Sequence, residues 1–288
     1  MSHHHRHFRI GLLIALTLAT GTGRTAAAQD RPKYERPPQA VLDVLHAPPP
    51  PAVSFSPDRQ QMLLLEWTRY PSIAEVAEPM LGLAGVRINP RTNGPHLPFY
   101  YTELRIKSVV DGKERQVKLP ATARLSAPYW TADSSRFAFT HTTPQGIEAW
   151  VVEVRSATAR RIPDLRLNAA YGAALQWMPD GRTLLCQAIP AKRGAPPAPP
   201  AVPEGPVIQE STGKAGPVRT YQDLLRNPHD EALFDYYATS QLVLVDTQRG
   251  RVQPVGKPAI IADAEPSPDG KHLLVVRLAR PYSYLLGA

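Results

Sequence analysis

The sequence contains a single cysteine, Cys186, which excludes an intrachain disulfide. A small extracellular scaffold that is held together by disulfides is therefore excluded as well. Cys186 follows Leu184 and Leu185 in an apolar run. We expect it to be a buried strand residue that contributes to packing, and not a nucleophile.

The sequence also lacks a membrane-spanning run at its start, since the apolar residues 10–19 fall short of the ~20 that a helix needs to cross a bilayer. Arg6 and Arg9 precede this run, and three alanines follow at 26–28. This order predicts a secretory signal peptide at residues 1–28, with a transit peptide as the weaker alternative. We expect an exported protein, in a bacterial periplasm, that has no contact with the membrane after cleavage.

No stretch concentrates positive charge, although the formal net charge is +8. Arg6, Arg9 and Arg24 belong to the predicted signal, and the other Lys and Arg residues are scattered without interleaved aromatics. We therefore expect no nucleic-acid partner. The four histidines between positions 3 and 7 also lie in the predicted signal, so we expect no metal site there.

Proline, by contrast, is abundant, with 32 residues in a chain of 288. That share is about twice the usual one. Proline interrupts helices and central strands, so this density favours short strands that are joined by loops. The hydrophobic fraction of 43% is sufficient for a buried core. Together these features predict an all-β fold.

One phrase occurs four times, and each copy is a tight turn that leads into an apolar strand. An aspartate in the turn, followed in two copies by glycine, suits the left-handed positions that such turns require. The four aspartates are Asp58, Asp133, Asp180 and Asp269.

A predicted hairpin follows three of these copies, as alternating apolar and polar residues on both sides of a turn. Asp133 and Asp180 are 47 residues apart, close to the ~40–45 residues of one four-stranded propeller blade. We therefore predict a partial β-propeller of about three to four blades at 52–288, preceded by an arm at 29–51. The alternative is a small closed propeller with unrecognised strands. The longer intervals contain insertions at 70–100 and 190–218.

The second insertion and the residues after it combine a Pro-rich loop, 195–206, with one short helix. The loop sequence suits neither a strand nor a helix. Asn227 is a suitable N-cap and Pro228 a suitable first helical residue. The run His229-Asp230-Glu231 has metal-ligand chemistry. Three consecutive helical residues point in different directions, however, so we expect a helix start and no metal site.

The segment 220–242, TYQDLLRNPHDEALFDYYATSQL, resembles a stretch in the propeller of glutamyl endopeptidase-like members of the prolyl oligopeptidase family of serine peptidases. Residues 37–45, 83–94 and 266–274 are similar too. The resemblance implies an enzyme in which an N-terminal propeller filters peptides for a C-terminal α/β-hydrolase domain. It also implies a Ser-Asp-His triad and cleavage after glutamate.

The sequence departs from this family in one decisive respect. A catalytic α/β-hydrolase domain needs a Gly-x-Ser-x-Gly elbow, and that pattern does not occur in these residues. The serines and histidines that do occur belong to repeat turns and strands, so none is assigned a catalytic role: Ser56, Ser267, His141 and His272. We expect no catalytic residue, cofactor or metal ligand in this chain.

Three hypotheses follow from these observations. In the first, the chain is the substrate-gating propeller portion of an exported serine peptidase, truncated before the catalytic domain and inactive alone. It would then meet peptide substrates only through that missing domain. In the second, it is an independent periplasmic propeller that binds a protein or cell-envelope partner. In the third, it is a hydrolase with an unrecognised site.

Overall fold

The computed structural model describes residues 35–202, 213 and 220–288. The predicted signal peptide and the start of the predicted arm lie outside these residues. The chain divides into two compact units, Met1–Ala47 and Pro48–Ala288. In the first unit, helix α1 (Gln39–His46) buries none of its residues. Within the described residues, no helix is both long and apolar enough to cross a membrane.

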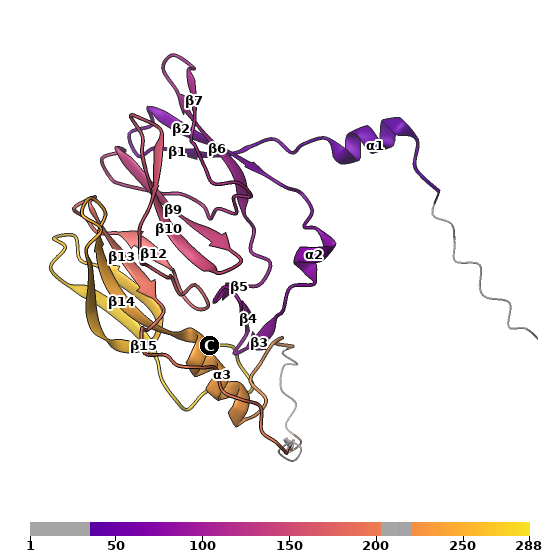
Figure 1. The fold of residues 1–288 in the computed structure, drawn as a ribbon, viewed down its shortest axis with the longest axis vertical. Helices are drawn as coiled ribbons and strands as arrows, with labels where there is room; N and C mark the ends of the chain where they lie inside the picture. Colours follow the sequence, from indigo (N-terminus) through magenta and orange to yellow (C-terminus); the bar gives the residue numbers. More distant parts are fainter. Residues whose placement is uncertain (1–34, 203–212, 214–219) are drawn as a thin grey trace, which may run out of the picture. The chain divides into compact units, whose positions relative to one another are not determined.

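The second unit is built from antiparallel sheets that follow one another along the chain (Figure 1). The first sheet has the order β1 (Ala52–Phe55), β2 (Gln61–Trp67), β6 (Tyr101–Ser108), β7 (Glu114–Gln116). The second consists of β8 (Tyr129–Trp130), β9 (Arg136–Thr143), β10 (Gly146–Glu153) and β11 (Thr158–Arg161). The third has five strands, β12 (Leu175–Trp177), β13 (Thr183–Ala188), β14 (Thr239–Asp246), β15 (Val252–Pro266) and β16 (Leu273–Leu278). The predicted all-β fold is confirmed.

Strand β15 belongs to two units of the repeat. Its first part pairs with β14, from Val252 to Ile260, and its second part pairs with β16, from Ile260 to Pro266. The second part and β16 therefore form the same hairpin that opens each earlier sheet. The four opening hairpins share one register around the turn: Phe55↔Met62, Trp130↔Phe137, Trp177↔Leu184 and Pro266↔Leu273. The repeat predicted from the sequence is thus a structural repeat, whereas the number of blades stays a prediction.

The aspartate of each repeat organises its turn. Its carboxylate accepts a hydrogen bond from the backbone N–H two residues further on, as from Ser135 to Asp133 at 3.0 Å. The residue directly after the aspartate has a positive φ in all four turns: Arg59, Ser134, Gly181 and Gly270. The hydroxyl of Thr131, followed by the N–H of Ser135, lowers the pKa of Asp133 because both donors stabilise the ionised carboxylate.

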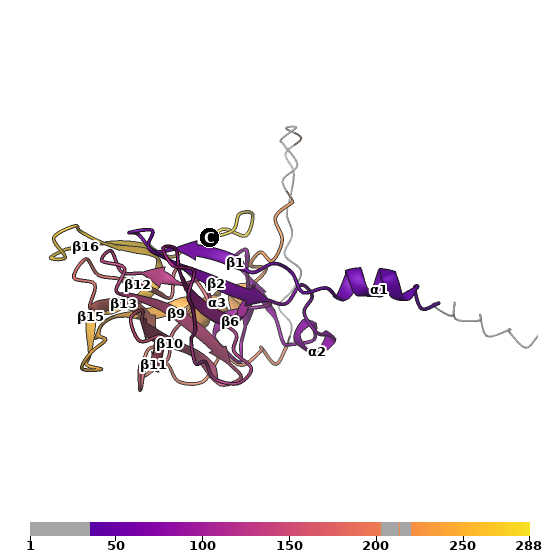
Figure 2. The same cartoon turned by 90° about the horizontal axis from the view of Figure 1, so that it is seen from above.

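The core lies between the sheets. Leu63 and Leu65 of the first sheet pack with Phe137 and Phe139 of the second. A second cluster joins Ala138 and its neighbours to strands β12, β13 and β14 of the third sheet, and a third cluster lies between β13 and β14 on one side and the hairpin of β15 and β16 on the other. Figure 2 shows the same sheets from above. Each sheet therefore buries its apolar side chains against the next sheet, as blades of a propeller do.

Two insertions leave the repeat at the same point, the connection from the second to the third strand of a sheet. The first insertion holds α2 (Ile73–Val76) and a small sheet of β3 (Leu81–Leu83), β4 (Val86–Asn89) and β5 (Gly94–Pro95). The second contains helix α3 (Pro228–Ala238). The two insertions meet in one apolar cluster, to which Ile88 and Phe234 contribute. Arg87 and Asp223 add an ion pair at 2.7 Å.

The helix prediction is confirmed for α3 and incomplete for the chain. The Asn227 side chain accepts a hydrogen bond from the N–H of Asp230 at 2.8 Å, and Pro228 is the first helical residue. Two helices were not predicted, α1 and the single turn α2. Of the Pro-rich loop, residues 195–202 are described, and they form neither strand nor helix.

Candidate functional site

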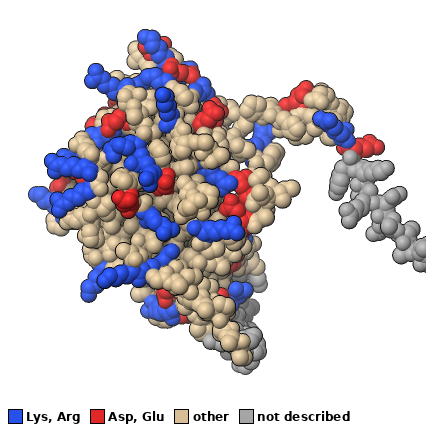
Figure 3. Space-filling model, in the orientation of Figure 1, with Lys and Arg blue, Asp and Glu red and all other residues tan. Residues whose placement is uncertain are grey.

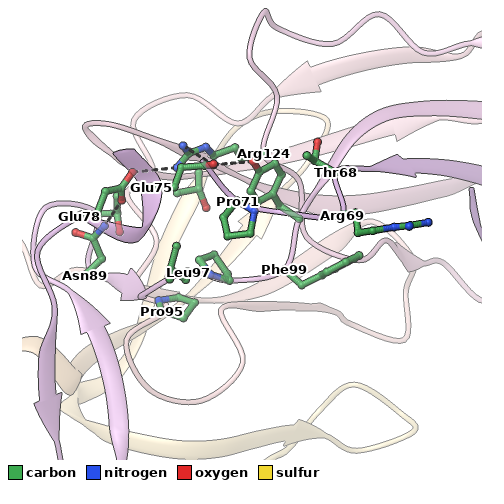
Figure 4. A pocket seen from close by; sticks show the side chains of 14 residues that line it. Thr68, Arg69, Pro71, Glu75, Glu78, Asn89, Pro95, Leu97, Phe99 and Arg124 are labelled. Carbon is green, nitrogen blue, oxygen red and sulfur yellow. Dashed lines mark hydrogen bonds and ion pairs between the residues drawn. The ribbon is translucent and has the colours of Figure 1, made fainter. Parts of the chain in front are cut away.

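A cavity of about 220 Å³ lies between the first insertion and the start of the second sheet (Figure 4). Its apolar wall consists of Pro71, Pro95, Leu97, Pro98 and Phe99. Five of its polar side chains form one connected group: Glu75 and Glu78 from α2 and the turn after it, Asn89 from β4, Tyr100 from just before β6, and Arg124 from the connection that precedes β8.

Arg124 is the centre of the polar side. Its guanidinium lies 2.8 Å from a carboxylate oxygen of Glu75 and 3.3 Å from one of Glu78. It also lies over the ring of Tyr100, with 5.4 Å between Cζ and the ring centroid. One arginine of the main repeat thereby holds two carboxylates of the insertion.

Each carboxylate oxygen of Glu75 and Glu78 has at least one donor within hydrogen-bond or ion-pair distance. The Tyr100 hydroxyl donates to Glu75 Oε1 at 2.6 Å, and the Ser72 N–H donates to Glu75 Oε2 at 2.7 Å. The Asn89 amide donates to Glu78 Oε2 at 2.6 Å. The bond from Tyr100 lowers the pKa of Glu75, while burial and the same bond raise the pKa of Tyr100. Glu75 is thus held as an anion, which suits an anchor and does not suit a general acid.

Arg69 also lines the cavity, but its side chain extends away from Glu75 and Glu78 (Figure 4). The face of the molecule in Figure 3 shows positive and negative side chains interspersed. Neither observation indicates a cluster of positive charge that would bind an anion. The geometry of this region therefore indicates that Arg124 fastens the first insertion to the repeat.

The residues to which we assigned no catalytic role occupy separate structural positions. The hydroxyls of Ser56 and Ser267 donate to Asp58 and Asp269 of their own turns, both at 2.6 Å. His141 is buried, and its Nδ1 lies 3.3 Å from Glu148 Oε2. The same oxygen accepts a hydrogen bond from the indole of Trp150 at 2.9 Å. The serine hydrogen bonds thus stabilise two repeat turns, and the contact of His141 with Glu148 lies between the paired strands β9 and β10.

Cys186 and the helix-start run also have structural surroundings. Cys186 lies in the core between the second and third sheets, and burial raises the pKa of its thiol, which opposes thiolate formation. The Asp230 carboxylate accepts hydrogen bonds from Arg226, and Glu231 is paired with Arg280. No group of three or more metal-ligating side chains occurs among the residues that the structure describes.

Comparison with known proteins gives a clear relationship. No family model matches the chain. A probable chloroplastic glutamyl endopeptidase of Oryza sativa is 38% identical over 268 residues, which cover 88% of this chain. One from Arabidopsis thaliana is 38% identical over 283 residues, or 93% of the chain. The chain is homologous to glutamyl endopeptidases. The resemblance predicted from the sequence is thus confirmed, and the chain spans 28% of the length of these two endopeptidases.

Solved structures are similar to the chain at much lower sequence identity. The β-propeller domain of the trilobed protease from Pyrococcus furiosus has a TM-score of 0.37 at 11% identity, covering 76% of this chain and 46% of that one. An acylaminoacyl peptidase of Pyrococcus horikoshii has 0.38 at 14%, covering 77% and 26%. TolB from Acinetobacter baumannii has 0.34 at 13%, covering 84% and 51%. At these TM-scores, the structural similarities carry no argument about the function of this chain, which is a relative of glutamyl endopeptidases.

The cavity residues were not found by sequence reasoning, which treated 70–100 only as an insertion. A local signal was present for α2, since Ser72 and Glu75 have the spacing of a capping box. The contact of Arg124 with Glu75 joins residues that are far apart in the chain, and no local sequence pattern predicts it.

We expect Arg124→Met to lower the free energy of unfolding by about 1–2 kcal/mol, because Glu75 and Glu78 would lose their shared counter-charge in a half-buried site. Urea denaturation measures this change. Arg69→Met is the matched control, since Arg69 lines the same cavity while pointing away from the carboxylates. Equal stability of the two variants would contradict an anchoring role for Arg124.

Proposed function

We propose that this chain is the substrate-gating propeller portion of an exported serine peptidase of the prolyl oligopeptidase type. The peptidase would cleave peptides after glutamate. The observation that carries the proposal is the 38% identity to glutamyl endopeptidases across about nine-tenths of the chain. The repeated sheets, each packed on the next, also suit this role, because a rigid wall of sheets excludes folded proteins more readily than extended peptides.

In this proposal the chain contributes no bond-breaking group. The Gly-x-Ser-x-Gly elbow, which presents the nucleophile in α/β-hydrolases, does not occur in the sequence. Ser56 and Ser267 use their hydroxyls within repeat turns. Peptides would therefore be hydrolysed by a catalytic domain outside residues 1–288, and the propeller would determine which of them reach it.

The purified 288-residue chain is expected to release no product from a fluorogenic peptide with glutamate before the scissile bond. The reason is that no serine of the sequence lies in a nucleophile elbow. A glutamyl endopeptidase that contains its hydrolase domain is the positive control, on the same peptide. Turnover that persists through repurification and disappears when one serine of this chain is replaced would contradict the proposal.

The export part of the proposal depends on residues 1–28 alone. A β-lactamase reporter joined after residue 35 is expected to protect bacterial cells from ampicillin, because the enzyme must reach the periplasm to act. Replacing Leu12 and Leu13 by aspartate interrupts the apolar run and should abolish protection, while the same changes at Thr22 and Thr25, which lie after the run, should not. Protection that survives the Leu12 and Leu13 changes would contradict a secretory signal.

A further inference from the structure

A second cavity, of about 410 Å³, lies beside the first one. Its walls are the first insertion, the connection that precedes β8, and the end of β9 with the turn that follows it. The two cavities have five lining residues in common: Glu78, Asn89, Thr92, Arg124 and Thr142. A ligand of extended shape can therefore contact both cavities at once.

Hydrogen bonds within the chain hold the walls of the second cavity in place. The N–H of Thr142 donates to the carbonyl oxygen of Arg124 at 2.9 Å, which joins β9 to the connection before β8. The hydroxyl of Thr143 donates to the carbonyl oxygen of Gly146 at 2.9 Å, across the turn from β9 to β10. The cavity is thus formed before a ligand arrives, as small-molecule sites generally are.

Two buried side chains have hydrogen-bonding atoms that are open to this cavity. His141 and Thr92 are 5% and 6% exposed, and both line it. In the part of the chain that the structure describes, neither His141 Nε2 nor Thr92 Oγ1 has a hydrogen-bond partner. The fully enclosed side-chain atoms without a partner there belong to Arg136 and Gln187. The Nε2 and Oγ1 atoms are therefore not enclosed, and the open space beside them is the cavity.

Glu148 determines what His141 offers to a ligand. A carboxylate only accepts hydrogen bonds, so the proton of the neutral imidazole is assigned to Nδ1, 3.3 Å from Glu148 Oε2. The indole of Trp150 donates to the same oxygen at 2.9 Å, which fixes this acceptor in place. Nε2 then carries no proton in the neutral ring and accepts a hydrogen bond. It suits the backbone N–H of a peptide.

One charged side chain of the second cavity remains unpaired. Arg124 lies 3.3 Å from a carboxylate oxygen of Glu78 and is also paired with Glu75. Arg91 is exposed, and it has no ion pair with any residue that the structure describes. A carboxylate that enters the cavity would therefore find its counter-charge in Arg91 and a hydroxyl donor in the adjacent Thr92.

We propose that the two cavities bind a peptide in which an apolar residue stands next to an acidic one. The acidic side chain pairs with Arg91 and accepts a hydrogen bond from Thr92. A backbone N–H of the peptide donates to His141 Nε2. The apolar side chain lies in the first cavity, against Leu97 and Phe99 (Figure 4). The inference rests on the proposed function, since it takes the ligand of the propeller to be a peptide, and it names the residues that select that peptide.

Isothermal titration calorimetry with blocked tetrapeptides tests this site on the purified chain. N-acetyl-Gly-Leu-Glu-Gly-amide carries one carboxylate, and the same peptide with glutamine in place of glutamate has nearly the same size and no charge. The chain is expected to bind the glutamate peptide at least about fivefold more tightly, because a charge-assisted hydrogen bond is stronger than a neutral one. Serine in place of leucine should also weaken binding, since the contact with the apolar wall is lost.

Two variants separate the roles of the charge and of the acceptor. Arg91→Gln should bind the glutamate and glutamine peptides equally, because it removes the counter-charge that distinguishes them. His141→Phe should weaken both peptides by the same factor, because both donate the same backbone N–H. Arg69→Gln is the matched control for Arg91→Gln, since Arg69 is also exposed and lines the first cavity. It should retain the preference for glutamate.

Thermal unfolding of Arg91→Gln and Arg69→Gln should match that of the unchanged chain, because both side chains are exposed. The site is overturned if the chain binds neither peptide at up to about 5 mM, if it does not distinguish glutamate from glutamine, if serine replaces leucine without loss, or if Arg91→Gln retains the preference. These results would leave the proposed function in place, because that rests on sequence identity. Hydrolysis of a peptide by the chain itself would contradict the proposed function and leave the measured binding unaffected.

Discussion

Face-to-face packing of neighbouring sheets is the interaction on which the rest of this structure depends. Each sheet is only a few strands wide and has two faces, so it cannot bury its apolar side chains alone. Phe137 and Ala138, which are adjacent in β9, enter two different clusters with two different sheets. A central sheet is thus stabilised from both sides, and the first sheet and the last hairpin from one. This difference governs both the stability and the surface chemistry of the chain.

The insertions are added to this arrangement without interrupting it. Both leave the repeat between the second and third strands of a sheet, and they pack on each other through Ile88 and Phe234. Polar contacts then join them to the repeat. Arg124 holds Glu75 and Glu78, and the amide of Asn93 donates to Asn168 at 2.6 Å in a buried site. The candidate site is therefore a place where added structure is anchored to the repeat.

The sequence predicts the repeat well because the repeat is specified locally. An aspartate, a left-handed residue and an apolar strand lie within a few positions, and the helix start at Asn227 is equally local. The division of β15 between β14 and β16 was not predicted, since strand pairing depends on residues that come later in the chain. The cavity was missed for the same reason. Arg124 and Glu75 are brought together by the fold, and neither has a sequence neighbourhood that identifies the other.

Amide hydrogen exchange tests the dependence on neighbouring sheets most directly. Strands β2 and β9 are comparable, because each is paired on both sides within its own sheet. They differ in that β9 is covered by other sheets on both faces and β2 on one. The account predicts slower exchange in β9 than in β2. Equal protection of the two strands would contradict the claim that packing between sheets, beyond pairing within them, stabilises this chain.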